Sequence, residues 1–575
     1  MAELAGLKPC SANLLVDNMA FVQAMSSPDA TKIGANGAAV YTEAGVGDYR
    51  VTLFTMLNRG LEDTYIKDSI QHVFSTGDET AMRDLFVMAF QTRDVRGGKG
   101  ERKLFYSFIK SLWDYDRPVI RKMLALVPEY GCWRDMWELI RIAPELQERV
   151  FEVVREAWHR DQTAYAAIEA GEKANLSLLA KWLPRENSST YRGMAGRLAK
   201  LFYPYEQSER KRIMNYRKEV SKLNRALKTV EINMCGGKWR DIEPEAVPGR
   251  CMKLHTKAFL NEKGPSELRY PSNEDRMECR AHFQEFIADL AKGVKKVHGA
   301  NVIMPHELVT KALMCHASTD ELAINQGQWE SIREETLKFG GLGKCVPMCD
   351  FSGSMDGVPK LVSLALGILI SEINHSAFRD HILTFDAEPL WYSFRGKTTL
   401  KEKLDTVSYR VGQGLNTNFY KACTRIIEKM KEAKVPVGEE PEDLIVLTDM
   451  GFDDASRNND YRQHSDKNED WDYILGRIRE DFAAASKEVW GEGPGWKPPR
   501  IVVWNLRAEY KDFHAKANQE GVVQLSGWSP AMLKALQVGG IQVMTPFQGM
   551  RSILDDARYD PVRRVWDEVH AGRAQ

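Results

Sequence analysis

The sequence lacks the marks of a secreted, membrane-spanning or zinc-binding protein. Its nine cysteines are scattered and form no Cys-x-x-Cys pair, so we expect reduced, mostly buried thiols in an intracellular protein. The N-terminus has no basic segment followed by an apolar one, and we expect no signal peptide. The longest apolar run, Leu361 to Ile370, is too short to cross a bilayer. We therefore expect a soluble, cytoplasmic, monomeric protein.

Recognisable catalytic patterns are missing as well. The chain has no His-Glu-x-x-His and no Gly-x-Ser-x-Gly segment, so neither a zinc-protease helix nor a nucleophile elbow is expected. His316 and His375 are more typical of packing or surface histidines than of general bases. We therefore expect a protein that is not an enzyme.

A phosphate-binding loop is excluded by spacing. Residues 92–102 place glycines on both sides of Lys99, but Gly-x-x-x-x-Gly-Lys-Ser/Thr is absent and a helical pattern precedes the segment. We interpret the segment as a turn between two helices, with Glu101 favourable at the start of the second one. The same helix start could hold an anion with the help of Lys99 and Arg102.

The overall charge is too small to steer the chain to nucleic acid. Its 575 residues carry a formal net charge of −1, so any basic surface must be local. An apolar content of 43% and a charged content of 28% are ordinary for a globular protein. The length predicts roughly two to four domains.

The most informative segment is an apolar run followed by acidic and hydroxyl residues. Cys345 to Cys349 is typical of a buried parallel strand, and Asp350, Ser352 and Ser354 follow at every second position. The loop after such a strand lies at the carboxyl edge of the sheet, where α/β proteins bind ligands. One carboxylate and two hydroxyls suit a hard cation such as magnesium. For these five residues alone, a turn with local hydrogen bonds is the alternative.

The segments that follow predict a doubly wound, Rossmann-like α/β domain. Helices are expected over Lys360–Asn374 and Phe419–Lys431, the second one after a polar loop. Further strands are expected at His381–Phe385, Asp443–Asp449 and Arg500–Asn505, and the middle one again ends in an aspartate.

Residues 343–547 resemble the von Willebrand factor A (vWA) domain and its metal-ion-dependent adhesion site. In that family the Asp-x-Ser-x-Ser, a threonine from a later loop and an aspartate after a later strand surround one divalent cation. The resemblance implies an Mg²⁺, Mn²⁺ or Ca²⁺ site to which a protein partner donates a carboxylate. Its expected ligands are Asp350, Ser352, Ser354, Thr417 and Asp449. Asn418 departs from the aspartate that is common in such loops, and residues 456–472 are a polar insertion.

Residues 48–342 have a helical pattern almost throughout. Short amphipathic segments with short loops favour a stacked helical-repeat array, and an irregular helical bundle is the alternative because no strict period is found. Residues 1–47, rich in Ala, Gly and Ser, are expected to form an irregular arm with one helix near Leu14–Met25. The expected helices include Thr80–Phe90, Lys103–Trp113, Pro118–Leu126, Trp133–Ile142, Leu146–Trp158, Leu176–Trp182 and Arg192–Tyr203.

Two short segments of this half, Thr92–Arg102 and Val127–Asp135, resemble the TROVE module of the Ro autoantigen ribonucleoproteins. They are more similar still to an uncharacterised family that fuses a Ro-like helical module to a C-terminal vWA domain. Four further segments also resemble that family: Tyr216–Lys218, Lys238–Ile242, Val247–Pro248 and, near the end of the vWA-like part, Leu525–Pro530. The resemblance implies an all-α ring of HEAT-like repeats closed by the vWA domain. Residues 548–575 would add a C-terminal helix packed on one or the other.

Positive charge is concentrated between Ser208 and Val230. This segment holds eight Lys or Arg against two Glu, and its apolar residues recur at helical spacing, so one face is expected to pack and the other to be basic. A charge run alone is usually a solvated face. Beside the Ro resemblance, it indicates a surface that contacts the phosphates of structured or misfolded RNA. The expected contacts are Arg192, Arg197, Lys200, Arg210, Lys211, Arg217, Lys218, Lys222 and Arg225.

Three functions remain open from sequence. The favoured one is a non-enzymatic, Ro-like RNA-binding protein whose vWA domain recruits a protein partner. The second is a protein-interaction scaffold or assembly component that binds no RNA. The third and least favoured is a magnesium-dependent nuclease or phosphatase that uses Asp350 and Asp449.

Overall fold

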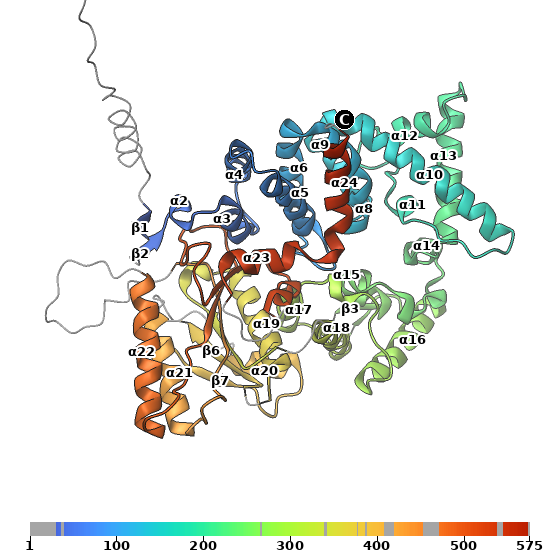
Figure 1. The fold of residues 1–575 in the computed structure, drawn as a ribbon. Helices are drawn as coiled ribbons and strands as arrows, with labels where there is room; N and C mark the ends of the chain where they lie inside the picture. Colours follow the sequence, from blue (N-terminus) through green and yellow to red (C-terminus); the bar gives the residue numbers. More distant parts are fainter. Residues whose placement is uncertain are drawn as a thin grey trace, which may run out of the picture.

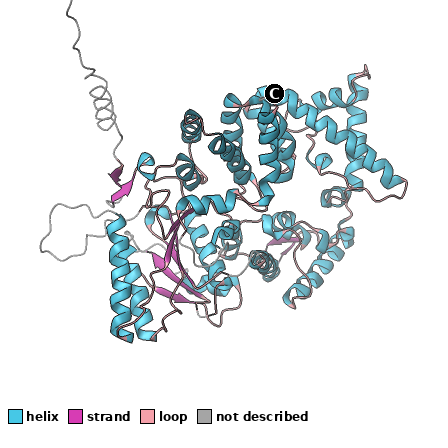
Figure 2. Cartoon of the chain, viewed as in Figure 1, coloured by secondary structure: helices cyan, strands magenta, loops and turns pink. Residues whose placement is uncertain are grey.

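The computed structural model shows a long helical part and a C-terminal α/β part (Figure 1). Helix dominates the first part and a single larger sheet marks the second (Figure 2). The structure describes residues 30–35, 39–264, 267–338, 342–376, 378–385, 388–407, 419–451, 471–536 and 544–572. No helix within these ranges is long and apolar enough to cross a membrane.

The helical part begins against the sheet, runs away from it and returns to the α/β part. α3 contacts β10, whereas α17 and α18 contact α19 (Figure 1). The predicted helical character of this half is confirmed. Its helices are α3 (Tyr49–Met56), α4 (Asp63–Ser75), α5 (Glu79–Arg93), α6 (Arg102–Tyr115), α7 (Arg117–Met123), α8 (Val127–Tyr130), α9 (Arg134–Ile142), α10 (Gln147–Glu169), α11 (Leu179–Trp182), α12 (Met194–Phe202), α13 (Glu209–Ala226), α14 (Val230–Gly236), α15 (Gly249–Phe259), α16 (Glu274–Ala291), α17 (Pro305–Ala312) and α18 (Thr319–Leu337), with a hairpin of β3 (Glu262–Gly264) and β4 (Glu267–Leu268) between α15 and α16.

Side-chain caps determine where several of these helices start. Asp78 accepts hydrogen bonds from the backbone N–H groups of Thr80 and Ala81 at the start of α5. Ser318 and Glu321 form a reciprocal capping box at the start of α18. Such caps satisfy backbone donors that have no partner within the helix, which makes these starts readable from sequence.

The α/β part contains a mixed sheet of six strands in the order β10-β9-β8-β5-β6-β7. Five strands are parallel, and β7 pairs antiparallel at the edge. The predicted α/β character is confirmed, although β7 and β10 were not among the predicted strands. The elements are β5 (Cys345–Asp350), α19 (Val358–Ile373), β6 (His381–Phe385), β7 (Trp391–Ser393), α20 (Leu400–Val407), α21 (Phe419–Ala433), β8 (Asp443–Thr448), α22 (Trp471–Trp490), β9 (Arg500–Asn505) and β10 (Val522–Ser526).

Helix α19 is apolar nearly all round because it is covered on two sides. It packs on β5, β6 and β8, and α17 and α18 lie against it. A buried ion pair fixes this contact: Lys403 Nζ lies 2.6 Å from Glu372 Oε1, and the indole N–H of Trp329 donates to the same carboxylate. α21 and α22 lie side by side at another face of the α/β part (Figure 1).

The N-terminal arm is partly ordered against the α/β part, contrary to the expectation of an irregular segment. Within residues 30–47, β1 (Thr31–Ile33) pairs with β2 (Ala39–Tyr41), and α2 (Glu43–Val46) follows. The N–H of Tyr41 donates to the carbonyl of Phe513 over 2.8 Å, and Lys32 pairs with Asp512 over 2.9 Å. Elements of three or four residues carry too little periodicity to be read from sequence. The helix expected near Leu14–Met25 lies outside the described residues.

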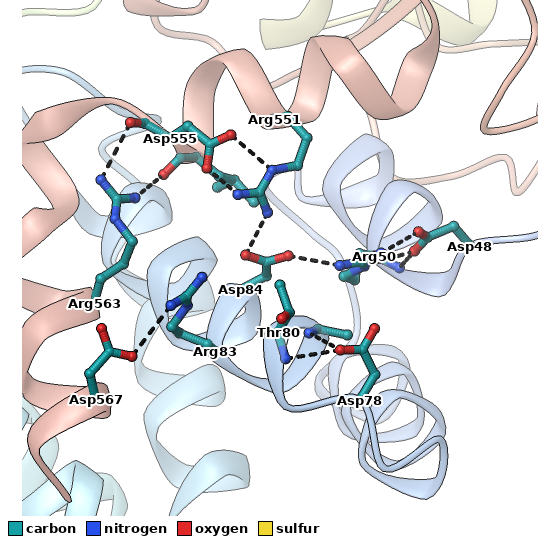
Figure 3. A network of polar contacts seen from close by, with 12 residues as sticks. Asp48, Arg50, Asp78, Thr80, Arg83, Asp84, Arg551, Asp555, Arg563 and Asp567 are labelled. Atoms are coloured by element: carbon teal, nitrogen blue, oxygen red, sulfur yellow. Dashed lines mark hydrogen bonds and ion pairs between the residues drawn. The ribbon is translucent and has the colours of Figure 1, made fainter. Parts of the chain in front are cut away.

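The C-terminal segment crosses from the α/β part onto the helical part. α23 (Pro546–Leu554) contacts β10, α3 and α5, and α24 (Asp560–Ala571) contacts α5 and α7. Figure 3 shows the polar network that holds this crossing. The buried carboxylate of Asp84 lies between Arg50 of α3, at 2.8 Å, and Arg551 of α23, at 2.6 Å. The predicted C-terminal helix therefore packs on the helical part.

Lys99 joins the two parts through a fully buried ammonium group. Its Nζ donates to the carbonyls of Phe54, at 2.9 Å, and Leu57, at 3.3 Å, and to the hydroxyl of Ser526 at the end of β10. Burial lowers the pKa of this group, against the effect of Glu101. Three donors meet three acceptors at the C-terminal end of α3, where the helix dipole favours a cation. Lys99 is therefore not available for the anion site considered from sequence.

Three of the six segments on which the family resemblance rests lie at or next to this junction. Gly98 allows the turn, because a Cβ there would lie 2.0 Å from the carbonyl oxygen of Gln91. The N–H of Gly527 donates to the side chain of Asn58 over 2.7 Å. Arg93 and Asp135, both buried, pair over 2.7 Å. Residues 92–102 and 525–530 thus join the two parts, and residues 127–135 contact the first of these segments.

Replacement of Lys99 by Met should destabilise the junction. The change removes the buried donor from the Leu57 carbonyl, and an unsatisfied buried polar group costs roughly 1–3 kcal/mol. We expect a lower urea midpoint for unfolding and faster proteolysis between the two parts. Lys103→Met, at an exposed position of α6, is the matched control. Equal midpoints for Lys99→Met and the control would show that the contact contributes no stability.

Candidate metal centre

The predicted acidic residues lie where the strand order of the sheet reverses. From edge to edge, β7-β6-β5-β8-β9-β10 reads as 3-2-1-4-5-6 in chain order within this part. The chain leaves β5 towards β6 and leaves β8 towards β9, so their carboxyl ends flank the switch point at which doubly wound sheets bind ligands. Asp350 ends β5, and Asp449 directly follows β8.

Asp350 is held rigidly by local and cross-strand donors. Its Oδ1 accepts from the backbone N–H of Ser352 at 2.9 Å, and its Oδ2 accepts from the hydroxyl of Thr448 at 2.7 Å. The hydroxyl oxygens of Ser352 and Ser354 lie 3.0 Å apart. Asp350 and Ser352 are buried and Ser354 is half-buried, so the three predicted ligands of this loop gather in one place.

Asp449 contributes an oxygen that lacks a partner among the described residues. Its Oδ1 accepts from the N–H of Gly451 at 3.0 Å, whereas its Oδ2 is buried and has no hydrogen bond to any residue that the structure describes. Arg507, in the segment after β9, donates to the carbonyl of Ser354 and pairs with Glu509 over 2.6 Å. The guanidinium group therefore fixes the serine turn beside Asp449.

Two buried carboxylates in one place carry an electrostatic cost. Burial, and then the charge of Asp449, raise the pKa of Asp350 to about 7. Burial also raises the pKa of Asp449, although the Ser354 hydroxyl and the Arg507 guanidinium oppose the shift. A buried anion without a full set of partners is unfavourable. A divalent cation would neutralise both charges.

The donor set fits a hard cation. Two hydroxyls and two carboxylates, one of which has a buried oxygen with no hydrogen bond to any described residue, are the all-oxygen chemistry that Mg²⁺ and Ca²⁺ take. In the described part of the chain, no group of three or more His, Cys, Asp or Glu residues forms an alternative metal site. Asp350, Ser352, Ser354 and Asp449 would hold the ion. Thr417, and Asn418 beside it, lie outside the described residues.

Sequence reasoning missed Thr448 and Arg507. The register pairs Cys349 with Leu447, which places the next residue, Thr448, beside Asp350. A hydroxyl residue immediately before the aspartate of β8 was the available signal. Arg507 carries no such signal, because its contact with Ser354 depends on where β9 ends relative to β5.

The nine predicted RNA contacts lie on and next to two packed helices. Arg192 precedes α12, Arg197 and Lys200 are on it, and the other six are on α13. α12 and α13 contact each other, and α13 also contacts α10 and α11. Tyr216, Val220 and Leu223 are buried on the inner face of α13, as its periodicity predicts.

Most of these cations are exposed and lack an acidic partner. Arg217 pairs with Glu186 over 2.8 Å, and Lys222 lies 3.7 Å from Glu169. Within the described ranges, the remaining seven form no ion pair, although Arg197 lies over the ring of Phe151. The surface therefore presents positive charge that neighbouring carboxylates do not neutralise. We name it the α12–α13 basic surface, made of the nine residues above.

The raised pKa of Asp350 predicts a pH dependence of the metal-free protein. Between about pH 4 and pH 7 the folded state keeps a proton that the unfolded state has lost, so stability falls as pH rises through this range. Asp350→Asn should remove part of this loss of stability at high pH. With a chelator present, its melting temperature near pH 8 should be roughly 2–6 °C above that of the wild type. Melting curves at several pH values test this, with Asp405→Asn on α20 as the control. An unchanged pH profile in Asp350→Asn would contradict the assignment.

Comparison with known families and proteins finds relatives whose descriptions specify no ligand or reaction. Residues 144–342 match a family model described as Domain of unknown function (DUF2828), and residues 344–549 match one described as Domain of unknown function (DUF7788). The boundary between the two matches coincides with the start of β5. The chain is also similar to Uncharacterized protein L728 of Acanthamoeba polyphaga mimivirus, with 23% identity over 542 residues, 92% of this chain and 88% of the relative. That similarity spans both the helical part and the α/β part.

Proposed function

We propose that this protein is a non-enzymatic, Ro-like RNA-binding protein whose α/β part is a vWA domain that binds a divalent cation and recruits a protein partner. The observation that carries the cation site is the buried Asp449 Oδ2, which has no partner among the described residues and lies by the Asp350 and serine cluster. The strand order supports the vWA assignment, because it places this cluster at the switch point.

The residues of the site suit capture of a carboxylate better than hydrolysis. A bound cation would supply an open coordination position for a carboxylate of the partner. Asp350 contributes a carboxylate that is held in place, since the N–H of Ser352 and the hydroxyl of Thr448 donate hydrogen bonds to its two oxygens. Ser352 and Ser354 contribute neutral oxygens, so they add no negative charge that would repel an incoming anion. Arg507 at the rim adds to that attraction.

The α12–α13 basic surface supports the RNA half of the proposal. Its unneutralised cations are suited to phosphates, whose contacts dominate nucleic-acid affinity. The helical part starts and ends against the α/β part, which is consistent with a closed ring of repeats. A scaffold without RNA is the second candidate, and the ion pairs of Arg217 and Lys222 favour it because they already neutralise part of the surface. The ratio of absorbance at 260 and 280 nm of the purified protein separates the two candidates by showing whether nucleic acid is retained.

Removal of Asp350 should abolish cation binding. We expect Asp350→Ala to lower Mg²⁺ or Mn²⁺ affinity by at least about 100-fold in calorimetry, and Thr448→Val, which removes a supporting hydrogen bond, to lower it about 10-fold. Asp405→Ala, an exposed carboxylate of α20, should bind like the wild type. RNA binding should survive in all three variants. Full metal affinity in Asp350→Ala would refute the site.

Removal of unpaired cations from α13 should weaken RNA binding and its salt dependence. With Arg210, Lys211, Lys218 and Arg225 replaced by Ala, the slope of log affinity against log salt should fall by up to about 3, because each contact releases counterions. The control replaces Arg425, Lys429, Lys434 and Lys487, on or next to α21 and α22. If both quadruple variants keep the wild-type slope, the α12–α13 basic surface does not bind the phosphates.

A further inference from the structure

Tyr205 is an exposed aromatic residue at one end of the α12–α13 basic surface. Its relative exposure of 93% is the highest among the large hydrophobic side chains described. By contrast, Tyr203 is half-buried, and its hydroxyl donates to the carbonyl of Asn215. The side chain of Tyr205, two residues after Tyr203, makes no hydrogen bond and no ring contact with any residue in the described ranges.

Tyr205 lies in a turn that is fixed by backbone hydrogen bonds and by a proline. The N–H of Glu206 donates to the carbonyl of Tyr203 over 3.3 Å, which closes a four-residue turn with Pro204 in its second position. Proline fixes the backbone there. The turn is anchored on both sides, because the N–H of Tyr203 bonds to Ala199 at the end of α12 and Ser208 caps α13. An isolated exposed apolar residue needs no explanation, but this one is displayed by a fixed turn.

Cations of both helices lie close to the turn along the chain. α12 ends three residues before Tyr205, and α13 begins four residues after it, so Lys200, Arg210 and Lys211 lie at the same end of the packed pair. All three are exposed and form no ion pair with a described residue. Of the two nearby carboxylates, Glu206 accepts from the N–H of Ser208 at 3.0 Å, and Glu209 lies at the start of α13, where the helix dipole favours it.

We propose that Tyr205 stacks on an unpaired base of the bound RNA, so that this surface prefers single-stranded or looped RNA to a fully paired duplex. The inference rests on the proposed RNA binding. An exposed ring beside unneutralised cations matches the way that single strands are bound, with phosphates on cations and bases on aromatic rings. Paired bases within a duplex stack on one another and leave no face for the ring. Stacking requires no base-specific hydrogen bond, so the preference concerns strandedness and not sequence.

Binding of two labelled RNAs tests this inference. The probes are a single strand of about 12 nucleotides of mixed sequence and the duplex it forms with its complement, both followed by fluorescence anisotropy. Tyr205→Ala should weaken binding of the single strand roughly 5- to 100-fold and leave duplex binding and the salt slope unchanged, because no charge is removed. Tyr205→Phe keeps the ring and should bind like the wild type. Tyr270→Ala, at a tyrosine that is 50% exposed in the connection before α16, is the matched control.

The outcomes separate this inference from the proposal on which it rests. If the wild type binds neither RNA, the proposed RNA function fails. If the wild type binds the single strand and Tyr205→Ala binds it equally well, RNA binding stands and the stacking role is overturned. Equal weakening for single strand and duplex in Tyr205→Ala would also overturn it, since the ring would then not distinguish unpaired bases.

Discussion

The buried ammonium of Lys99 is the contact on which the arrangement of the two parts depends. An ammonium removed from water is tolerated when each of its three hydrogens meets an acceptor, and here these acceptors come from α3, from the residue that follows it and from the end of β10. Apolar surfaces can slide relative to one another at little cost. Three directed hydrogen bonds cannot, so the ammonium fixes the orientation of the helical part on the sheet as well as its contact.

The same junction reaches the candidate metal centre through β9. Asn505, the last residue of that strand, donates from its side chain to the carbonyl of Thr55 at 3.0 Å and accepts from the N–H of Arg507 at 3.0 Å. Arg507 in turn donates to the carbonyl of Ser354 in the serine turn. The position of this turn therefore depends on how α3 docks on the sheet. A site built this way is held by supporting contacts as well as by its own loop.

Features that depend on residues close together in the sequence were predicted, and features that depend on contacts between distant segments were not. β6 and β9 have the predicted boundaries, because their apolar runs are bounded by polar residues. Asp350, Ser352 and Ser354 lie together as expected, because they are two residues apart in one short loop. The roles of Thr448, Arg507 and Lys99 depend on which strands and helices become neighbours, and local periodicity does not encode that. The anion site considered at the start of α6 would need Lys99, which is instead bonded at the junction, and Gly98 beside it lets the chain approach Gln91 closely.

The two proposed ligand surfaces lie on different parts of the molecule. α13 contacts α10, α11 and α12, whereas the candidate metal centre lies at the carboxyl edge of the sheet and is supported from α3 (Figure 1). Ligands at sites without shared partners usually bind with additive free energies, so the proposed RNA and the proposed protein partner would not exclude one another. Coupling between them requires a ligand that favours one arrangement of the two parts over another. The contacts around Lys99, Asp84 and Glu372 join the two parts, and any such coupling would therefore act through these contacts and not through either ligand surface.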